Sequence, residues 1–301
     1  MSPTRASSLL LAASLTIGSG LVSAQEPVET TPDLSSVMAE LAPIIAKHTA
    51  AIGYPALSSS ELARAQRGEL VIRETKVSGA PLPRLTMATV MPYPVEAMYL
   101  VLGDLTAHAD FVPQLDHSVI LKNSKAGMVR EAFQYMGAPY PAQDRGWINK
   151  MENNTGLYAA SGGRVWQLPW SMQCEEYKVW LQTAVSTQTL PTIVPVDLDD
   201  LQDATVPNFG GGAWTLVPLG QAATYVRYDA FTDPNPNSIE KGFVSALGTK
   251  VQTGMFSDLA PLAAAYADGR QRTSDILVDM QGKSSKGLIE ALRKLRAASG
   301  R

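Results

Sequence analysis

Cysteine is almost absent from this chain, in which Cys174 is the only one among 301 residues. A single cysteine can form neither an intramolecular disulfide nor a cysteine-based metal cluster. Because free cysteine is among the most buried residue types, we expect Cys174 to be a small buried side chain. An excess of positive charge is also missing, since 25 Lys and Arg stand against 28 Asp and Glu. Non-specific binding to nucleic acid is therefore not indicated, and we expect no nucleic-acid partner.

The sequence also lacks a recognisable catalytic signature. It contains no G-x-S-x-G nucleophile elbow, and its three histidines show no signature spacing with a serine or cysteine. The stretch NFGGGAW runs into a strand pattern without the Gly-Lys-Ser/Thr ending of a phosphate-binding loop. We interpret that stretch as a mobile loop or hairpin. We therefore name no catalytic residue and expect no cofactor.

Two clusters of acidic and histidine residues do not form a convincing metal site. The acidic run from Asp197 to Asp203 does not match the spacing of a calcium-binding loop. The other cluster spans a helix break at Val112-Pro113, which scatters the directions of its side chains: Asp104, His108, Asp110, Asp116 and His117. We predict no bound metal.

Long apolar runs are missing from the chain after residue 24. No apolar run there approaches the roughly 20 residues that a membrane helix needs. The first 24 residues have Arg5 near the start, an apolar stretch from Leu9 to Val22, and small residues up to Ala24. These features are typical of a secretory signal peptide. We expect cleavage near Ala24 and a periplasmic or secreted product.

The remaining chain shows helical and strand patterns in a definite order. Helical periodicity appears at 33–51 and from Ser58 to Gly68, and Pro94 opens a third helix. Strand patterns precede and follow that third helix, in GELVIRET, LPRLTMATVM, HSVILKN, MVREAFQYMG, RGWINKME, GLYAAS, RVWQLPW, EYKVWLQTAVST, GAWTLVPL and ATYVRYDAFT. This order predicts an α+β fold rather than alternating βαβ units.

After the turn DPNPN, one long amphipathic helix is expected to reach Tyr266. Its apolar residues recur every three or four positions: Ile239, Phe243, Leu247, Val251, Met255, Leu259 and Leu262. Such a stripe needs an equally long apolar partner, which a curved sheet supplies. From the pattern alone, a solid core and a hollow one remain alternatives.

Four stretches resemble the START-like branch of the helix-grip proteins, which bind lipids and other hydrophobic ligands. They are RAQRGELVIRE, MPYPVEAMYLVLGDLTAHADFVPQL, YPAQDRGWINK and GGGAWTLVPLGQAATYVRYDAFTDPNPNSIEKGF, and they cover roughly Ser60 to Gly269. The resemblance implies a curved antiparallel sheet wrapped around a long C-terminal helix, with a ligand cavity between them. The chain departs from the family where Arg145 is followed by Gly146 instead of an Asp.

The residue patterns and the resemblance together suggest four segments and a set of ligand-binding side chains. The segments are a signal peptide at 1–24, a helical extension at 25–59, the START-like domain at 60–269 and a basic helical tail at 270–301. Arg145, Arg130 and Arg227 are candidates for a polar anchor, and Arg145 is preferred because it lies at the family motif. The predicted ligand-binding residues are Tyr135, Arg145, Trp147, Trp166, Trp180, Trp214, Tyr228, Phe243, Leu247 and Met255.

Our leading hypothesis is an exported, non-catalytic protein that binds a lipid, sterol or similar molecule in an internal cavity and transfers it in the cell envelope. The basic tail is expected to make transient membrane contact. The first alternative is a cyclase or hydrolase in the same cavity, for which Asp144, Glu131, Asp229 or a tyrosine would have to serve as acid or base. The second is an adaptor with a solid core.

Overall fold

The computed structural model describes residues 31–49, 55–124, 127–139, 142–190, 192, 194–237, 241–268 and 277–298, with the backbone alone at 241–253. The predicted signal peptide at 1–24 lies outside the described residues. The described elements belong to one unit, Thr31–Arg301. The predicted segment boundaries stay predictions.

The described strands form one antiparallel sheet with the order β1-β2-β8-β7-β6-β5-β4-β3. The last strand in the chain therefore pairs with the second, and Met87 of β2 lies opposite Tyr228 of β8. The strands are β1 (Val71–Thr75), β2 (Arg84–Met91), β3 (Leu115–Ser124), β4 (Val129–Met136), β5 (Arg145–Glu152), β6 (Trp166–Met172), β7 (Phe209–Pro218) and β8 (Thr224–Asp233). The predicted α+β fold is confirmed.

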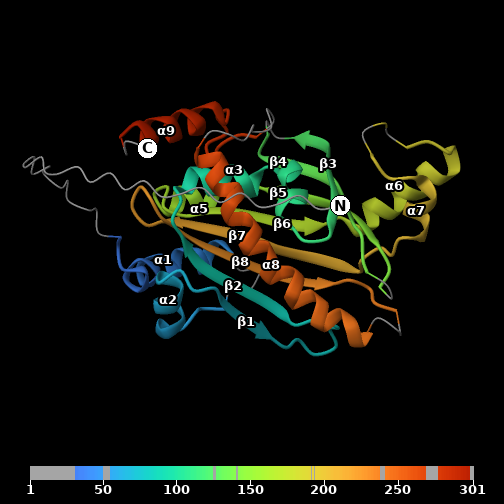
Figure 1. Ribbon diagram of the computed structural model, residues 1–301, viewed down its shortest axis with the longest axis horizontal. Helices are drawn as coiled ribbons and strands as arrows, with labels where there is room; N and C mark the ends of the chain where they lie inside the picture. Colours follow the sequence, from blue (N-terminus) through green and yellow to red (C-terminus); the bar gives the residue numbers. More distant parts are fainter. Residues whose placement is uncertain are drawn as a thin grey trace, which may run out of the picture. The chain divides into compact units, whose positions relative to one another are not determined.

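The inner face of the sheet packs against the helices that follow β2 and β8. Side chains alternate between the two faces of a strand, and the inner set includes Met87, Leu168, Trp214 and Val226. The covering elements are α3 (Val95–Gly103), η1 (Leu105–Ala107), α4 (His108–Phe111), α8 (Lys241–Ala267) and α9 (Lys286–Ala298). In Figure 1, α8 crosses the sheet diagonally, as the long amphipathic pattern predicted.

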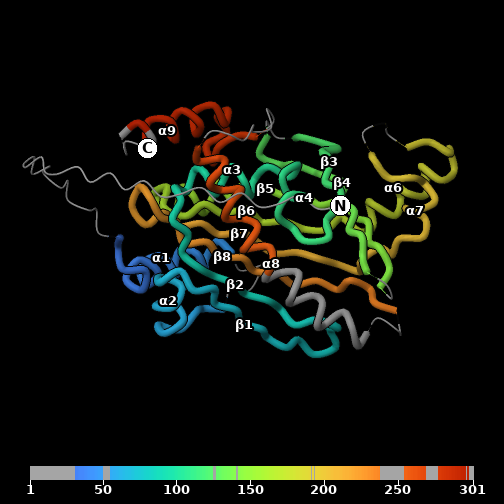
Figure 2. The backbone as a smooth tube through the Cα atoms, viewed as in Figure 1, coloured from blue at the N-terminus to red at the C-terminus, as the bar shows by residue number. Residues whose placement is uncertain are grey.

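The outer face carries two separate groups of helices. Helices α1 (Leu34–His48) and α2 (Ser59–Gln66) cover β1, β2 and β8, while α5 (Thr155–Ala160) packs on α1. The predicted cap of α2 is confirmed, because the Ser58 side chain accepts from the Glu61 N–H. Between β6 and β7 the chain forms α6 (Cys174–Thr187) and α7 (Leu198–Asp203), which Figure 2 traces away from the sheet and back.

Two predicted strands are helices. The stretch GLYAAS belongs to α5, which begins after Asn154 because the Asn154 side chain accepts from the Leu157 N–H. The stretch EYKVWLQTAVST belongs to α6, whose buried side chains Cys174, Tyr177 and Ala184 recur at helical rather than alternating positions. Its aromatic and β-branched residues suggested a strand, but burial on one helical face decides the conformation. Cys174 is buried, as expected.

The glycine-rich stretch NFGGGAW is not a mobile loop but the start of a strand in the β7–β8 hairpin, which agrees with the hairpin alternative. From Phe209 onward it belongs to β7, in which Gly212 lies opposite Trp170 on one side and Ala230 on the other. A Cβ at Gly212 would collide with the Asp229 carbonyl oxygen and lie 3.0 Å from Cζ2 of Trp170. Glycine therefore provides the room that the Trp170 ring occupies.

No described helix is long and apolar enough to span a membrane.

Candidate functional site

A pocket of about 200 Å³ lies between the inner face of the sheet and the helices α4 and α8. Strands β3 to β8 contribute to its wall, together with the loop that joins β4 to β5 and the turn that follows β8. The lining is mainly apolar and aromatic, and it includes Phe111, Met151 and Met255. The pocket lies where alternation along six neighbouring strands directs side chains towards α8.

Aromatic rings form one side of the pocket. The ring of Tyr228 stacks with that of Trp170, with centroids 6.1 Å apart and planes 9° apart. Trp214 contacts the same tyrosine at 4.4 Å and also contacts Phe256 of α8 at 5.7 Å. These residues come from three neighbouring strands and one helix, and Gly212 gives Trp170 the space to reach Tyr228. The result is a broad, rigid apolar surface suited to an apolar ligand.

A chain of hydrogen bonds forms another side of the pocket. Trp147 donates from Nε1 to Oε1 of Gln134 over 3.0 Å. Nε2 of Gln134 lies 3.0 Å from the Ser118 hydroxyl and 3.4 Å from Nδ1 of His108. Nε2 of His108 lies 3.0 Å from the Leu102 carbonyl oxygen, which can only accept. Burial lowers the pKa of His108, so a neutral ring with its proton on Nε2 fits both contacts.

Arg145 lines the pocket and joins two segments. Its Nε donates to the Pro234 carbonyl oxygen over 2.8 Å, and its Nη1 donates to the Gln143 carbonyl oxygen over 2.5 Å. Pro234 belongs to the turn before α8, whereas Gln143 precedes β5. Arg145 therefore links the end of the β4–β5 loop to the turn before the covering helix.

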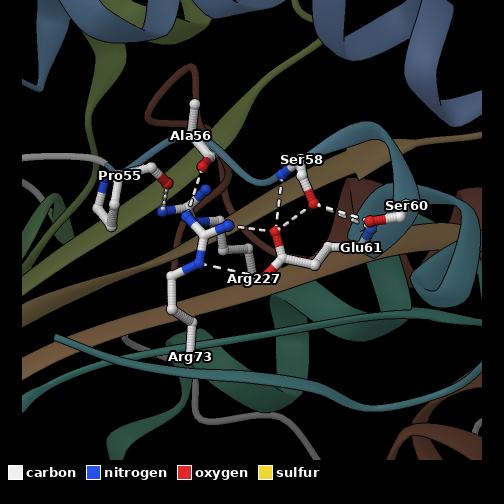
Figure 3. Close-up of polar contacts among 7 residues, drawn as sticks. All are labelled: Pro55, Ala56, Ser58, Ser60, Glu61, Arg73 and Arg227. Carbon is white, nitrogen blue, oxygen red and sulfur yellow. Dashed lines mark hydrogen bonds and ion pairs between the residues drawn. The ribbon is translucent and has the colours of Figure 1, made fainter.

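The other two candidate arginines lie away from this pocket. Arg130 is buried on the inner face, where it donates to the Gly127 carbonyl oxygen over 2.6 Å and to Oδ1 of Asn153 over 2.9 Å. Arg227 is on the outer face and pairs with Asp229 at 2.7 Å. It also donates to the Pro55 carbonyl oxygen, as Figure 3 shows.

The structure brings half of the predicted ligand-binding residues together. The predicted residues that line the pocket are Arg145, Trp147, Trp214, Tyr228 and Met255. Trp166 is on the inner face but packs elsewhere, against Tyr99 and Tyr158, and its indole donates to the Gly163 carbonyl oxygen. The side chains of Phe243 and Leu247 lie outside the described residues.

Tyr135 and Trp180 belong to the outer face. Tyr135 donates its hydroxyl to Asp144 over 2.6 Å, and Trp180 of α6 packs on Phe133 and Tyr177. Neither side chain lines the described pocket. Sequence reasoning also missed lining residues: Phe111, Gln134, Asn149 and Trp170. For Trp170, strand alternation with Trp166 and Leu168 was the available signal.

The three carboxylates named for the enzyme alternative point away from the pocket or lie on the opposite face of the sheet. Asp144 accepts from Tyr135 and from the Ala138 N–H, and Asp229 is held by Arg227 on the opposite face. Glu131 also lies on the outer face, where Lys122 approaches it. Both nitrogens of His108 have protein partners. The carboxylates named for the enzyme alternative are thus not placed in the described pocket wall, whereas one tyrosine, Tyr228, lines it.

Neither the family models nor the curated proteins that were compared match this sequence. Solved structures match it instead. Human STARD10 is 12% identical with a TM-score of 0.51, and the match covers 77% of this chain and 82% of that one. A STAR-related lipid transfer protein fragment from Xanthomonas axonopodis is 17% identical over 69% of this chain and 97% of its own, with a TM-score of 0.48.

The Zhui aromatase/cyclase from Streptomyces sp. R1128 is 11% identical, with a TM-score of 0.38 over 60% of this chain and 93% of its own. The match with STARD10 shows a shared fold. The predicted START-like helix-grip fold, a sheet that curves around a long C-terminal helix, is therefore confirmed.

Proposed function

We propose that this protein binds one apolar small molecule between the sheet and α8 and carries it from one site to another. The observation that carries the proposal is the pocket itself, which combines aromatic rings from β6, β7 and β8 with apolar side chains from α4 and α8. The motif resemblance to proteins that bind hydrophobic ligands supports the same function. The absence of a carboxylate among the described lining residues favours binding over hydrolysis or cyclisation.

The size of the pocket restricts how a ligand enters. A volume of about 200 Å³ is smaller than the roughly 300–1,000 Å³ of typical ligand pockets. A sterol or a long acyl chain therefore requires the covering elements to move. Arg145 holds the turn before α8 against β5, so exchange would begin with the loss of its bond to the Pro234 carbonyl oxygen.

The affinity available from apolar contact is sufficient for such a carrier. Burial of roughly 400 Å² of ligand surface at about 25 cal/mol/Å² gives a gross gain near 10 kcal/mol. Association and ordering reduce that gain. The net value still allows competition with a membrane for a sparingly soluble molecule.

We place this carrier in the cell envelope because its first 24 residues have the pattern of a secretory signal peptide. Membrane contact through the tail is part of the proposal. The apolar residues Leu288 and Leu292 of α9 are buried in the core that includes α3, so exposed Lys286, Arg293 and Lys294 would make that contact. Cell fractionation with N-terminal sequencing tests export, and an uncleaved cytosolic product would contradict it.

Native mass spectrometry and solvent extraction of the purified protein test ligand binding directly. We expect a bound hydrophobic molecule, or uptake of one from a lipid extract. Ala138→Trp would place a large ring in the pocket and prevent uptake. Val179→Trp, on the exposed face of α6, is the matched control and should bind as the wild type does. A wild-type protein that neither contains nor takes up a hydrophobe would refute the proposal.

A further inference from the structure

The residues before α9 form a compact loop, Leu277–Ser285, called the C-terminal loop below. The Asp279 carboxylate accepts from the N–H groups of Gln281 and Lys283 over 2.8 Å each. The Asp279 N–H donates to the Lys283 carbonyl oxygen over 2.7 Å. These bonds within the loop give it a defined shape.

Three buried polar side chains fasten the C-terminal loop to the rest of the protein. Tyr99 of α3 donates its hydroxyl to the Val278 carbonyl oxygen. Asn153, which follows β5, donates from Nδ2 to the Asp279 carbonyl oxygen over 3.2 Å and to the Tyr99 hydroxyl oxygen over 2.8 Å. Arg130 donates to Oδ1 of Asn153 over 2.9 Å. The position of the loop is therefore fixed from within the core.

This fixed loop places Leu277 where α3 meets β6. Leu277 is 0% exposed and belongs to the same core cluster as the pocket-lining Met151 and Trp214. A Cβ at Gly103, the last residue of α3, would lie 3.1 Å from Cδ1 of Leu277 and 3.9 Å from Cδ1 of Leu168. The absence of a side chain at Gly103 therefore leaves room for Leu277 beside β6.

The junction of α3 and β6 adjoins the pocket. Leu168 lies opposite the pocket-lining Trp214 in the β6–β7 register, so the two side chains are neighbours on one face. Leu168 itself is fully buried and is not among the described lining residues. The open space thus ends where the side chains around Gly103 begin. Because protein interiors are closely packed, a longer ligand has to displace one of them.

We propose that Leu277 limits the length of the apolar ligand, because it fills space next to the pocket into which a longer chain would extend. The inference rests on the proposed ligand-binding function and makes Leu277 a specificity-determining residue. Helix α3 contacts β6 and β7 and is part of the main fold. Leu277 instead belongs to a loop held by a few hydrogen bonds, so it is the neighbour that can yield.

Competition binding with a homologous series tests this assignment on the full chain. Displacement of a fluorescent apolar dye gives dissociation constants for 1-alkanols from hexanol to hexadecanol. Each methylene that fits should tighten binding about fourfold, up to a length beyond which the dissociation constant stops falling. Leu277→Ala removes three carbon atoms and should move this limit to alkanols about two or three carbons longer. Shorter alkanols should bind as they do to the wild type.

Leu41→Ala is the matched control. It makes the same deletion at a buried position of α1, in the separate core on the outer face of the sheet. This variant should lose stability, as Leu277→Ala should, without moving the length limit. Urea unfolding shows whether each variant is folded under the binding conditions.

Tyr99→Phe is a second variant, which loosens the C-terminal loop and leaves Leu277 intact. It removes the hydroxyl that donates to the Val278 carbonyl oxygen. Alkanols longer than the wild-type limit should then bind about fivefold more tightly, because displacement of the loop breaks one hydrogen bond fewer. Shorter alkanols should be unaffected. This variant decides the question if Leu277→Ala does not fold.

The outcomes separate this inference from the function on which it rests. If folded Leu277→Ala keeps the wild-type length limit, Leu277 is only a core residue and the inference is refuted, while apolar binding stands. A wild-type affinity that rises without a limit up to hexadecanol would also refute it. If no alkanol displaces the dye from the wild-type protein, the proposed function itself fails.

Discussion

Glu61 is the residue at which acid should first loosen the N-terminal helices. It accepts from the Ser58 N–H and hydroxyl over 2.7 Å each and pairs with Arg73, which also donates to the Ala56 carbonyl oxygen (Figure 3). Burial alone would raise the pKa of Glu61, but the bonds from Ser58 and Arg73 lower it from 4.5 to about 2. The charged Glu61 carboxylate therefore links α2 to β1 through its ion pair with Arg73.

We predict that this contact stabilises the fold near neutral pH and is lost in acid. Because the folded pKa lies below the unfolded one, the contribution is complete above about pH 4.5 and disappears as the pH falls towards 2. Glu61→Gln should lower the free energy of unfolding by about 1 kcal/mol at pH 7, a modest amount because the pair is partly exposed. Urea unfolding from pH 7 to pH 3 should show this difference shrinking, and a constant difference would contradict the prediction.

Individual pocket residues were predictable only in part, as two neighbours on β4 show. Gln134 faces the pocket and Tyr135 faces outward, although the aromatic residue looked the better ligand contact. Alternation assigns the two residues to opposite faces but does not say which face is inner. The pairing of β4 with β5 and the position of α6 decide that, and both depend on contacts distant in sequence.

At the scale of elements, the misassignment of α6 has a similar cause. The stretch from Glu176 to Thr187 contains aromatic and β-branched residues that suit a strand, yet its buried residues follow a helical period. The chain leaves the sheet after β6, where the Gln173 N–H bonds to the Ile148 carbonyl oxygen. The helix then covers Phe133 and Ile148, a role that cannot be read from the local pattern.

In strand β7, the absence of a side chain at Gly212 leaves room for the Trp170 ring in the aromatic surface of the pocket. A larger residue at this position should therefore disturb that surface. Gly212→Val would place methyl groups against the Asp229 carbonyl oxygen and the Trp170 ring. We expect a loss of about 2–4 kcal/mol in the free energy of unfolding and weaker binding of every apolar probe. Urea denaturation and dye binding measure the two effects.

Gly287→Ala is the control for that substitution, because a Cβ at Gly287 meets nothing within 4 Å. Its position in the first turn of α9 should make the change neutral or stabilising by less than about 1 kcal/mol. Equal stability of the Gly212 and Gly287 variants would show that Trp170 does not depend on the space above Gly212.

For the whole molecule, the order of strands and helices predicted the architecture better than it predicted the site. The long apolar stripe of the C-terminal helix predicted that a sheet packs against it. The family resemblance predicted that this sheet is curved. Arg227 and Asp229 alternate with the pocket-lining Tyr228 and form a buried ion pair. The sequence did not indicate that Arg227 of this pair also binds the Pro55 carbonyl oxygen, in the segment before α2. The contact between Arg227 and Pro55 joins residues far apart in the chain, so the local sequence pattern cannot predict it.

The basic tail provides a prediction for the molecule as a whole. Helix α9 buries Leu288 and Leu292 in the core and leaves Lys286, Arg293 and Lys294 exposed, so attraction to anionic lipid would be electrostatic rather than insertional. Replacing these three residues by Glu should abolish flotation with phosphatidylserine-containing vesicles, because each basic residue near the surface contributes about 1 kcal/mol.

Lys178→Glu, on α6, serves as the control and should retain binding. Wild-type binding should weaken with added salt and be absent for neutral vesicles. Vesicle binding that survives the triple substitution would show that another surface meets the membrane.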